Sequence, residues 1–149
     1  MRAIPEEAYR RYSVPGELSF EYPRMLQPRD GWKEDVPTLS FTLDDGSPGK
    51  PVTIMVTKIE PSQPTYLEMA SAIAKDMDWQ SAKDGGSVTV AGVKSRLTFV
   101  AGESKTAYVP LGRDAYLTLV YSAPVESYET YLAAFNRVLK TMKLRGAKR

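Results

Sequence analysis

The strongest constraint on the fold lies in the last third of the chain, where a strand pattern leads into a helix pattern. The segment Ala115-Tyr-Leu-Thr-Leu-Val-Tyr-Ser122 is rich in the aromatic and β-branched residues that favour strands. After Pro124, apolar residues recur at i, i+3, i+4 and i+7, at Tyr128, Tyr131, Leu132, Phe135, Val138, Leu139 and Met142. We therefore expect a strand followed by a terminal amphipathic helix that buries one apolar stripe.

The first third of the chain predicts one short helix and one strand. Pro5 to Tyr12 has the first-turn proline and the two glutamates that favour a helix start, and Pro15-Gly16 would end it. Leu18-Ser-Phe-Glu-Tyr22 alternates apolar and polar residues before Pro23, which is typical of a half-buried strand. The stretch from Arg24 to Asp35 is expected to be a loop.

The middle of the chain predicts a hairpin, a helix and further strands. Val36–Leu43 and Pro51–Ile59 form the hairpin across the turn residues 44–49, and Thr65–Met77 forms a central helix. Four shorter strands are expected, at Trp79–Lys83, Ser87–Val90, Val93–Val100 and Thr106–Val109. This order favours the α+β class, with an antiparallel β-sheet flanked by helices.

Length and composition favour one domain spanning residues 1–149. The chain has 149 residues, 42% of them hydrophobic and 26% charged, which is ordinary for a soluble globular domain. Residues 1–16 are expected to form an N-terminal helical extension and residues 143–149 a basic tail. Cations of the last helix turn and the tail, among them Lys140 and Lys143, either complement the helix dipole or weakly contact an acidic surface.

Composition also excludes several functions. The chain has no cysteine and no histidine, so thiolate nucleophiles, imidazole bases and His- or Cys-ligated metals are absent, and we expect no enzyme, no metal and no cofactor. A net charge of +2 does not favour nucleic acid as a partner. The chain has no apolar run long enough for a transmembrane helix, and its first twelve residues are too polar for a signal peptide.

Three short motifs have structural explanations. Gly102-Glu-Ser-Lys-Thr106 ends like a phosphate-binding loop but lacks its glycines, so we expect a hairpin turn. Ser47-Pro-Gly-Lys50 has the serine-lysine spacing of penicillin-recognising enzymes without the companion motifs. The acidic pairs Asp44-Asp45 and Asp76-x-Asp78 supply too few oxygen ligands for calcium and are interpreted as turn and helix-end carboxylates.

Aromatic residues are the remaining candidates for a functional surface. Nine tyrosines are many for a chain of this length, and they suit either the rim of a core or an aromatic-lined groove. Trp32 either anchors its loop to the core or takes part in binding. The candidate partner-binding residues are Trp32, Tyr66, Tyr108 and Tyr116.

Several segments together resemble the PsbP-like fold, which PsbP-type photosystem proteins share with bacterial DcrB-like lipoproteins. They are Leu18-Ser-Phe-Glu-Tyr-Pro23, the Gly92-Val93 joint that leads into a strand, and Tyr116-Leu-Thr-Leu-Val-Tyr121 with the helix after it. The resemblance covers most of the chain from Leu18 onward. It implies an αβα sandwich without catalytic residues, used as a binding or scaffolding module and commonly exported.

Three functions follow as hypotheses. The first is a non-catalytic extracytoplasmic binding or assembly module with a protein partner, such as the soluble part of a lipoprotein whose targeting segment or membrane tether precedes this chain. The second is a cytoplasmic chaperone or adaptor similar to those associated with type VI secretion effectors. The third is a small-molecule carrier, or an enzyme that uses only tyrosine, lysine and carboxylate groups.

Overall fold

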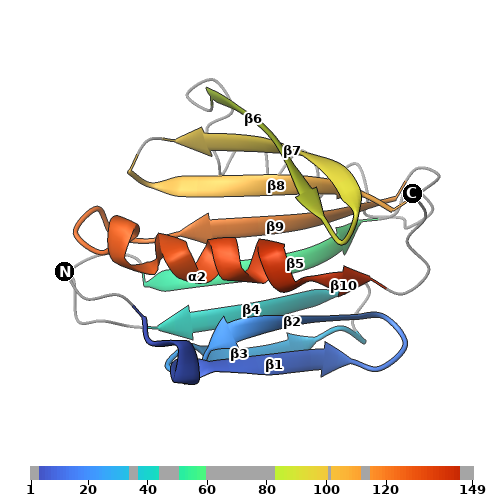
Figure 1. Ribbon diagram of the computed structural model, residues 1–149, viewed down its shortest axis with the longest axis horizontal. Helices are drawn as coiled ribbons and strands as arrows, with labels where there is room; N and C mark the ends of the chain where they lie inside the picture. The colour runs from blue at the N-terminus through green and yellow to red at the C-terminus, as the bar shows by residue number, and fades with distance from the viewer. Residues whose placement is uncertain are drawn as a thin grey trace.

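The computed structural model describes residues 4–33, 37–43, 51–59, 83–100, 102–111 and 115–144. These residues form two antiparallel sheets and one α-helix (Figure 1). The large sheet has seven strands in the order β3-β4-β5-β9-β8-β7-β6, and the small sheet has three in the order β1-β2-β10. The elements are η1 (Glu6–Ala8), β1 (Tyr9–Val14), β2 (Leu18–Pro23), β3 (Gln27–Gly31), β4 (Thr38–Leu43), β5 (Val52–Ile59), β6 (Lys83–Val90), β7 (Val93–Val100), β8 (Ser104–Pro110), β9 (Tyr116–Ser122), α2 (Tyr128–Thr141) and β10 (Lys143–Leu144).

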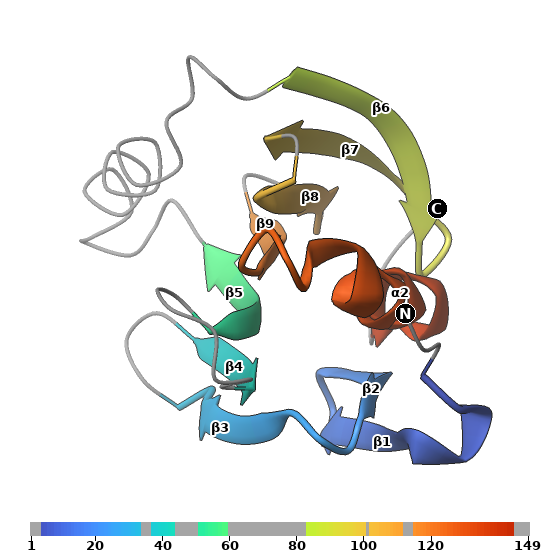
Figure 2. The ribbon, with the colours of Figure 1, turned by 90° about the vertical axis from the view of Figure 1, so that its left-hand side faces the viewer.

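The small sheet and α2 lie on the same side of the large sheet (Figure 2). α2 contacts β2 of the small sheet and β5, β9 and β6 of the large one. The core therefore lies between the two sheets and around the helix. Within the described ranges, α2 is 14 residues long and charged along one side, so nothing helical there could span a bilayer.

The predicted αβα sandwich is wrong. Among the described residues, ten strands accompany a single α-helix, and the side of the large sheet that holds the helix also holds a second sheet. Pro5 to Tyr12 contains only the single turn η1, and the chain then extends as β1, in which Tyr12 and Val14 turn inward while Arg11 and Ser13 are exposed. The predicted N-terminal helix is thus replaced by a strand. The predicted helix Thr65–Met77 lies outside the described residues and stays a prediction.

Two further strands lie where none was expected. β3 occupies the predicted loop, and its residues are almost all exposed, so it has no apolar alternation to reveal it. It is an edge strand, where Pro28 is tolerated, and its regularity comes from pairing with β4. β10 begins the predicted basic tail and pairs with β2 through Lys143↔Ser19 and Leu144↔Leu18.

The remaining strand predictions for described residues are confirmed. β2, β7, β8 and β9 lie where the sequence places them, and β4 and β5 form the expected antiparallel hairpin. β6 includes the predicted strand Ser87–Val90 and extends it back to Lys83. The Trp79–Lys83 prediction otherwise lies outside the described residues.

The C-terminal helix is confirmed, and its apolar stripe is the centre of the core. Phe135 and Val138 are fully buried, and the Phe135 ring stacks on that of Tyr121 at a centroid distance of 5.7 Å. The Tyr121 hydroxyl donates a hydrogen bond of 2.6 Å to the backbone oxygen of Tyr128, so the buried polar tip of this tyrosine is satisfied. β9 and α2 are consequently joined by both packing and a hydrogen bond.

The two sheets also meet through aromatic rings. Tyr12 and Phe20 of the small sheet pack on Phe41 of the large sheet, with centroid distances of 5.2 and 5.3 Å. The Tyr12 hydroxyl donates a hydrogen bond of 2.5 Å to Oδ2 of Asp30 on β3. This bond ties an edge of one sheet to an edge of the other.

We predict that Phe135→Ala lowers the free energy of unfolding by about 3 to 5 kcal/mol, because it removes a fully buried ring and leaves a cavity. Urea denaturation followed by circular dichroism measures the loss. Asn136→Ala, at an exposed position on the same helix, is the matched control and should stay within about 0.5 kcal/mol of the unsubstituted protein. Equal stability of the two variants would contradict the conclusion that the apolar stripe of α2 is the centre of the core.

We predict that the Tyr12 hydroxyl contributes stability that is lost at alkaline pH. Burial, and then the hydrogen bond to Asp30, raises the pKa of Tyr12 to about 12. Because the folded pKa lies above the ordinary value of 10.0, the contribution is fully present below pH 10 and falls as the pH approaches 12. The difference in unfolding free energy between the unsubstituted protein and Tyr12→Phe should therefore shrink over this range. A difference that is independent of pH would refute the coupling.

Candidate binding surface

The face of the large sheet that points away from α2 carries a row of side chains in register across five strands. Thr57 pairs with Thr118, Thr118 with Tyr108, Tyr108 with Arg96, and Arg96 with Ser87. Paired positions share one face of a sheet. Exposure increases along the row: Thr57 and Thr118 are buried, Tyr108 is half-buried, and Arg96 and Ser87 are exposed. The accessible part of this row is thus its β6–β7 end.

A second row runs beside the first. Lys94 precedes Arg96 by two residues and pairs with Thr89, so its side chain lies on the same face, and it is exposed. Tyr116 pairs with Pro110, which follows Tyr108 by two residues, so the two tyrosines are diagonal neighbours. Tyr116 is 42% exposed, high for a residue with a large ring. Two cations and two tyrosines therefore gather at one end of the face.

A bulge in β6 shapes this end of the sheet. The register of β6 against β7 shifts between Asp84 and Ser87, and Gly86 adopts a φ of +85°, which favours glycine. At Gly85 a Cβ atom would lie 3.2 Å from the Cβ atom of Leu97, a tight contact that β7 could accommodate only by a small shift. Beside the bulge is a shallow hollow of about 400 Å³, lined by Gly86, Ser87, Lys94, Ser95 and Arg96.

We name the set Ser87, Lys94, Arg96, Tyr108 and Tyr116 the β6–β7 corner. Neither Lys94 nor Arg96 makes an ion pair with any other residue that the structure describes. Burial raises the pKa of Tyr108, and the positive charge of Arg96 partly opposes this shift. Among the described residues, the corner therefore holds two cations without an ion-pair partner next to aromatic rings.

The structure brings together two of the four predicted partner-binding residues. Tyr108 and Tyr116 lie in the corner, whereas Tyr66 is outside the described residues. Trp32 follows β3 and is half-buried against the core, where its backbone N–H donates a 3.0 Å hydrogen bond to Oδ1 of Asp30. The anchoring interpretation of Trp32 agrees with this placement, and the tryptophan lies apart from the corner, at the opposite end of the strand order.

Lys94, Arg96 and Ser87 are the corner residues that sequence reasoning missed. The available signal was the spacing Lys94-x-Arg96 in a predicted strand directly after the Ala91-Gly92 turn, which places both cations on one face. Arg96 and Ser87 stand in one register row with Tyr108, and neither cation has an ion-pair partner among the described residues. The register row depends on pairing between strands.

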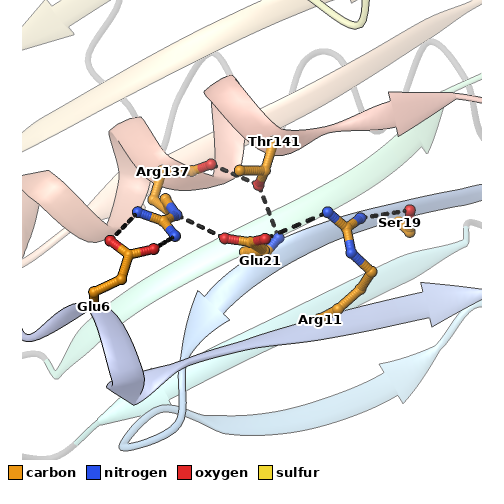
Figure 3. A network of polar contacts seen from close by, with 6 residues as sticks. All are labelled: Glu6, Arg11, Ser19, Glu21, Arg137 and Thr141. Atoms are coloured by element: carbon orange, nitrogen blue, oxygen red, sulfur yellow. Dashed lines mark hydrogen bonds and ion pairs between the residues drawn. The ribbon is translucent and has the colours of Figure 1, made fainter.

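A second polar cluster joins α2 to the small sheet, and Figure 3 shows its members. Arg137 donates a 2.7 Å hydrogen bond from Nε to Glu21 Oε1, and its terminal nitrogens pair with both carboxylate oxygens of Glu6. The hydroxyl of Thr141 accepts a hydrogen bond of 2.8 Å from the Glu21 backbone N–H. The guanidinium also lies 4.3 Å above the Tyr9 ring.

This cluster connects α2 to η1 and β2 and is not a candidate binding site. The hydrogen bond from Arg137 lowers the pKa of Glu6, which keeps its carboxylate charged beside the guanidinium. Arg11 pairs with Glu21 at 3.5 Å and donates to the Ser19 hydroxyl at 2.9 Å. Because each charge in the cluster is met by an opposite one, little electrostatic attraction remains for a ligand.

The structure also settles one of the motifs. Gly102 and Glu103 form the turn between β7 and β8, with Glu103 N–H donating to the Val100 oxygen at 2.9 Å, so the predicted hairpin turn is confirmed. Ser47–Lys50 and both acidic pairs lie outside the described residues. In the ranges that are described, no three potential metal-ligating side chains come together.

Comparison with known proteins identifies a solved structure with a similar fold. No protein-family model matches the chain, and no curated protein matches it. The solution structure of cyanobacterial PsbP (CyanoP) from Synechocystis sp. PCC 6803 is similar, with a TM-score of 0.51 and 14% identity, over 97% of this chain and 96% of that one. The fold is PsbP-like. At this identity the likeness supports the predicted fold relationship and carries no residue roles, and it does not bear on the DcrB-like part of the prediction.

Proposed function

We propose that this protein is a non-catalytic binding or assembly module that docks a protein partner on the β6–β7 corner. The observation that carries the proposal is that two exposed cations, which have no ion-pair partner among the described residues, share one face of the sheet with Tyr108 and Tyr116. Arg96 is in register with Tyr108. Tyrosine and arginine are enriched at protein interfaces, because they combine a large contact area with directed polar groups. Surface cations without aromatic neighbours are common and would not indicate a protein interface.

The proposal places the module outside the cytoplasm, as the soluble part of an exported protein or lipoprotein related to the DcrB-like group. The PsbP-like fold supports this part only by analogy, since one fold serves many functions. Fractionation of the source cells, with the protein expressed from its own gene, tests it directly. Recovery in the cytoplasm alone would move the module to the chaperone or adaptor alternative.

The carrier alternative has less support from the described residues. Besides the hollow at the corner, a hollow of about 410 Å³ lies between the β1–β2 turn and β10, and its lining includes Val14, Leu18, Lys143 and Leu144. Both hollows are shallow and open to solvent, whereas small-molecule sites usually enclose most of their ligand. A ligand that copurifies with the protein at one equivalent would favour the carrier.

We predict that the double variant Lys94→Gln/Arg96→Gln loses most of the partner that the unsubstituted protein captures from envelope extracts of the source organism. The substitutions remove both charges of the corner and keep a polar, unbranched side chain at each position. Quantitative mass spectrometry of the eluates measures the loss.

The matched control is Lys33→Gln/Lys140→Gln, which removes two exposed cations away from the corner. The control should capture the same partner in the same amount, and thermal unfolding should show both variants folded. If the corner variant and the control capture equally, the corner is not the docking site.

A further inference from the structure

β6 is an edge strand with a short regular stretch. Within the described part of the chain it pairs with β7 alone, and its register is regular from Ser87 to Val90, after the bulge. An edge strand presents backbone N–H and C=O groups that an extended segment can pair with. The bulge and the glycines limit that opportunity to about four residues.

The two faces of this stretch differ in chemistry. On the outer face Ser87 pairs with Arg96 and Thr89 with Lys94, so short hydroxyl side chains stand between the sheet edge and the long cations of β7. Ser87, Lys94 and Arg96 also line the hollow at the corner. On the opposite face Val90 is buried and Val88 half-buried, next to the core.

These faces define the strand that would fit beside β6. Neighbouring strands lie about 4.8 Å apart, and successive side chains alternate between faces. An added strand would place every second side chain next to Ser87 and Thr89, within reach of Arg96 and Lys94, and the others next to Val88. Carboxylates on the first set and apolar groups on the second would match both faces.

We propose that β6 binds an acidic extended segment of the partner by strand addition, with alternate carboxylates facing Lys94 and Arg96. This inference rests on the proposed function, because it specifies how the corner holds its partner. Backbone hydrogen bonds would give affinity and the alternating side chains specificity. A second copy of this chain fits less well, because edge-to-edge pairing through β6 would bring the cations of two corners toward each other.

The test uses a fluorescein-labelled eight-residue peptide of alternating glutamate and valine, and fluorescence anisotropy at an ionic strength of about 0.15 M, where the Debye length is about 8 Å. The peptide should bind the unsubstituted protein, and its lysine-valine counterpart should not. Lys94→Gln/Arg96→Gln should weaken binding about 2- to 30-fold, the loss expected for two exposed ion pairs. Lys33→Gln/Lys140→Gln should leave the affinity unchanged within about twofold, since exposed charges far from the site are screened.

Backbone methylation separates strand addition from simple charge attraction. Two further peptides carry N-methyl groups on alternate residues, one on the glutamates and one on the valines. In strand addition only one of these sets of N–H groups faces β6, so one peptide should lose binding and the other keep it. Equal binding by both peptides would overturn strand addition, because charge and side chains are the same in the two.

The outcomes distinguish the two proposals. Partner capture that depends on Lys94 and Arg96, with equal binding of both methylated peptides, overturns strand addition and leaves the docking corner standing. If neither capture nor peptide binding depends on these cations, both proposals fail. A third outcome is a dimer that substitutions in β6 abolish and that the glutamate peptide does not compete with. This outcome would identify a second copy of the chain as the occupant and overturn the acidic-strand assignment.

Discussion

Burial of one stripe of α2 between two sheets is the constraint on which the rest of the structure depends. The helix supplies Phe135, Val138 and Leu139 to the core and contacts strands of both sheets. Full burial of one such side chain contributes about 1.5 to 3 kcal/mol, a large share of the net stability of a domain. The polar side of the helix adds Arg137 and Thr141, which hold β2 through Glu21. The same helix thus joins the two sheets by apolar and by polar contacts.

The shape of the large sheet follows from this arrangement. The sheet curves around α2 until β6, its last strand, also contacts the helix (Figure 2). The bulge and the glycines of β6 permit that curvature, since a Cβ atom at Gly85 would crowd Leu97 and Phe99 of β7. Curvature toward the helix turns the outer side chains of β6 and β7 toward solvent. The β6–β7 corner is therefore a consequence of how the core closes.

The sequence predicted those elements whose patterns are long and locally complete. The spacing of α2 and the β-branched run of β5 each span several residues and identify a helix and a strand on their own. β1, β3 and β10 are short or edge strands. Each is held in strand conformation by pairing with another segment, which can lie far away in the sequence, as Leu18 does for Leu144. From local sequence alone, a helix is as good an interpretation of Pro5 to Tyr12 as a strand. A loop is likewise as good an interpretation of Gln27 to Gly31.

The candidate surface was predictable in the same partial way. Tyrosines are noticeable by number, so Tyr108 and Tyr116 were identified, although composition could not say that they are diagonal neighbours. Lys94 and Arg96 are ordinary surface cations until strand register places Arg96 beside Tyr108. Which of these residues are neighbours is decided by the pairing of β6, β7, β8 and β9, and no single segment of the sequence shows it.

Site-specific photocrosslinking in the source cells tests the central claim most directly. A benzophenone amino acid replaces Ser87 on β6 in one strain and Gln27 on β3, the other edge of the large sheet, in a second strain; both positions are exposed. The account predicts a defined partner adduct from position 87 and none from position 27. An adduct from position 27 alone would contradict it, because the partner would then dock at the opposite edge.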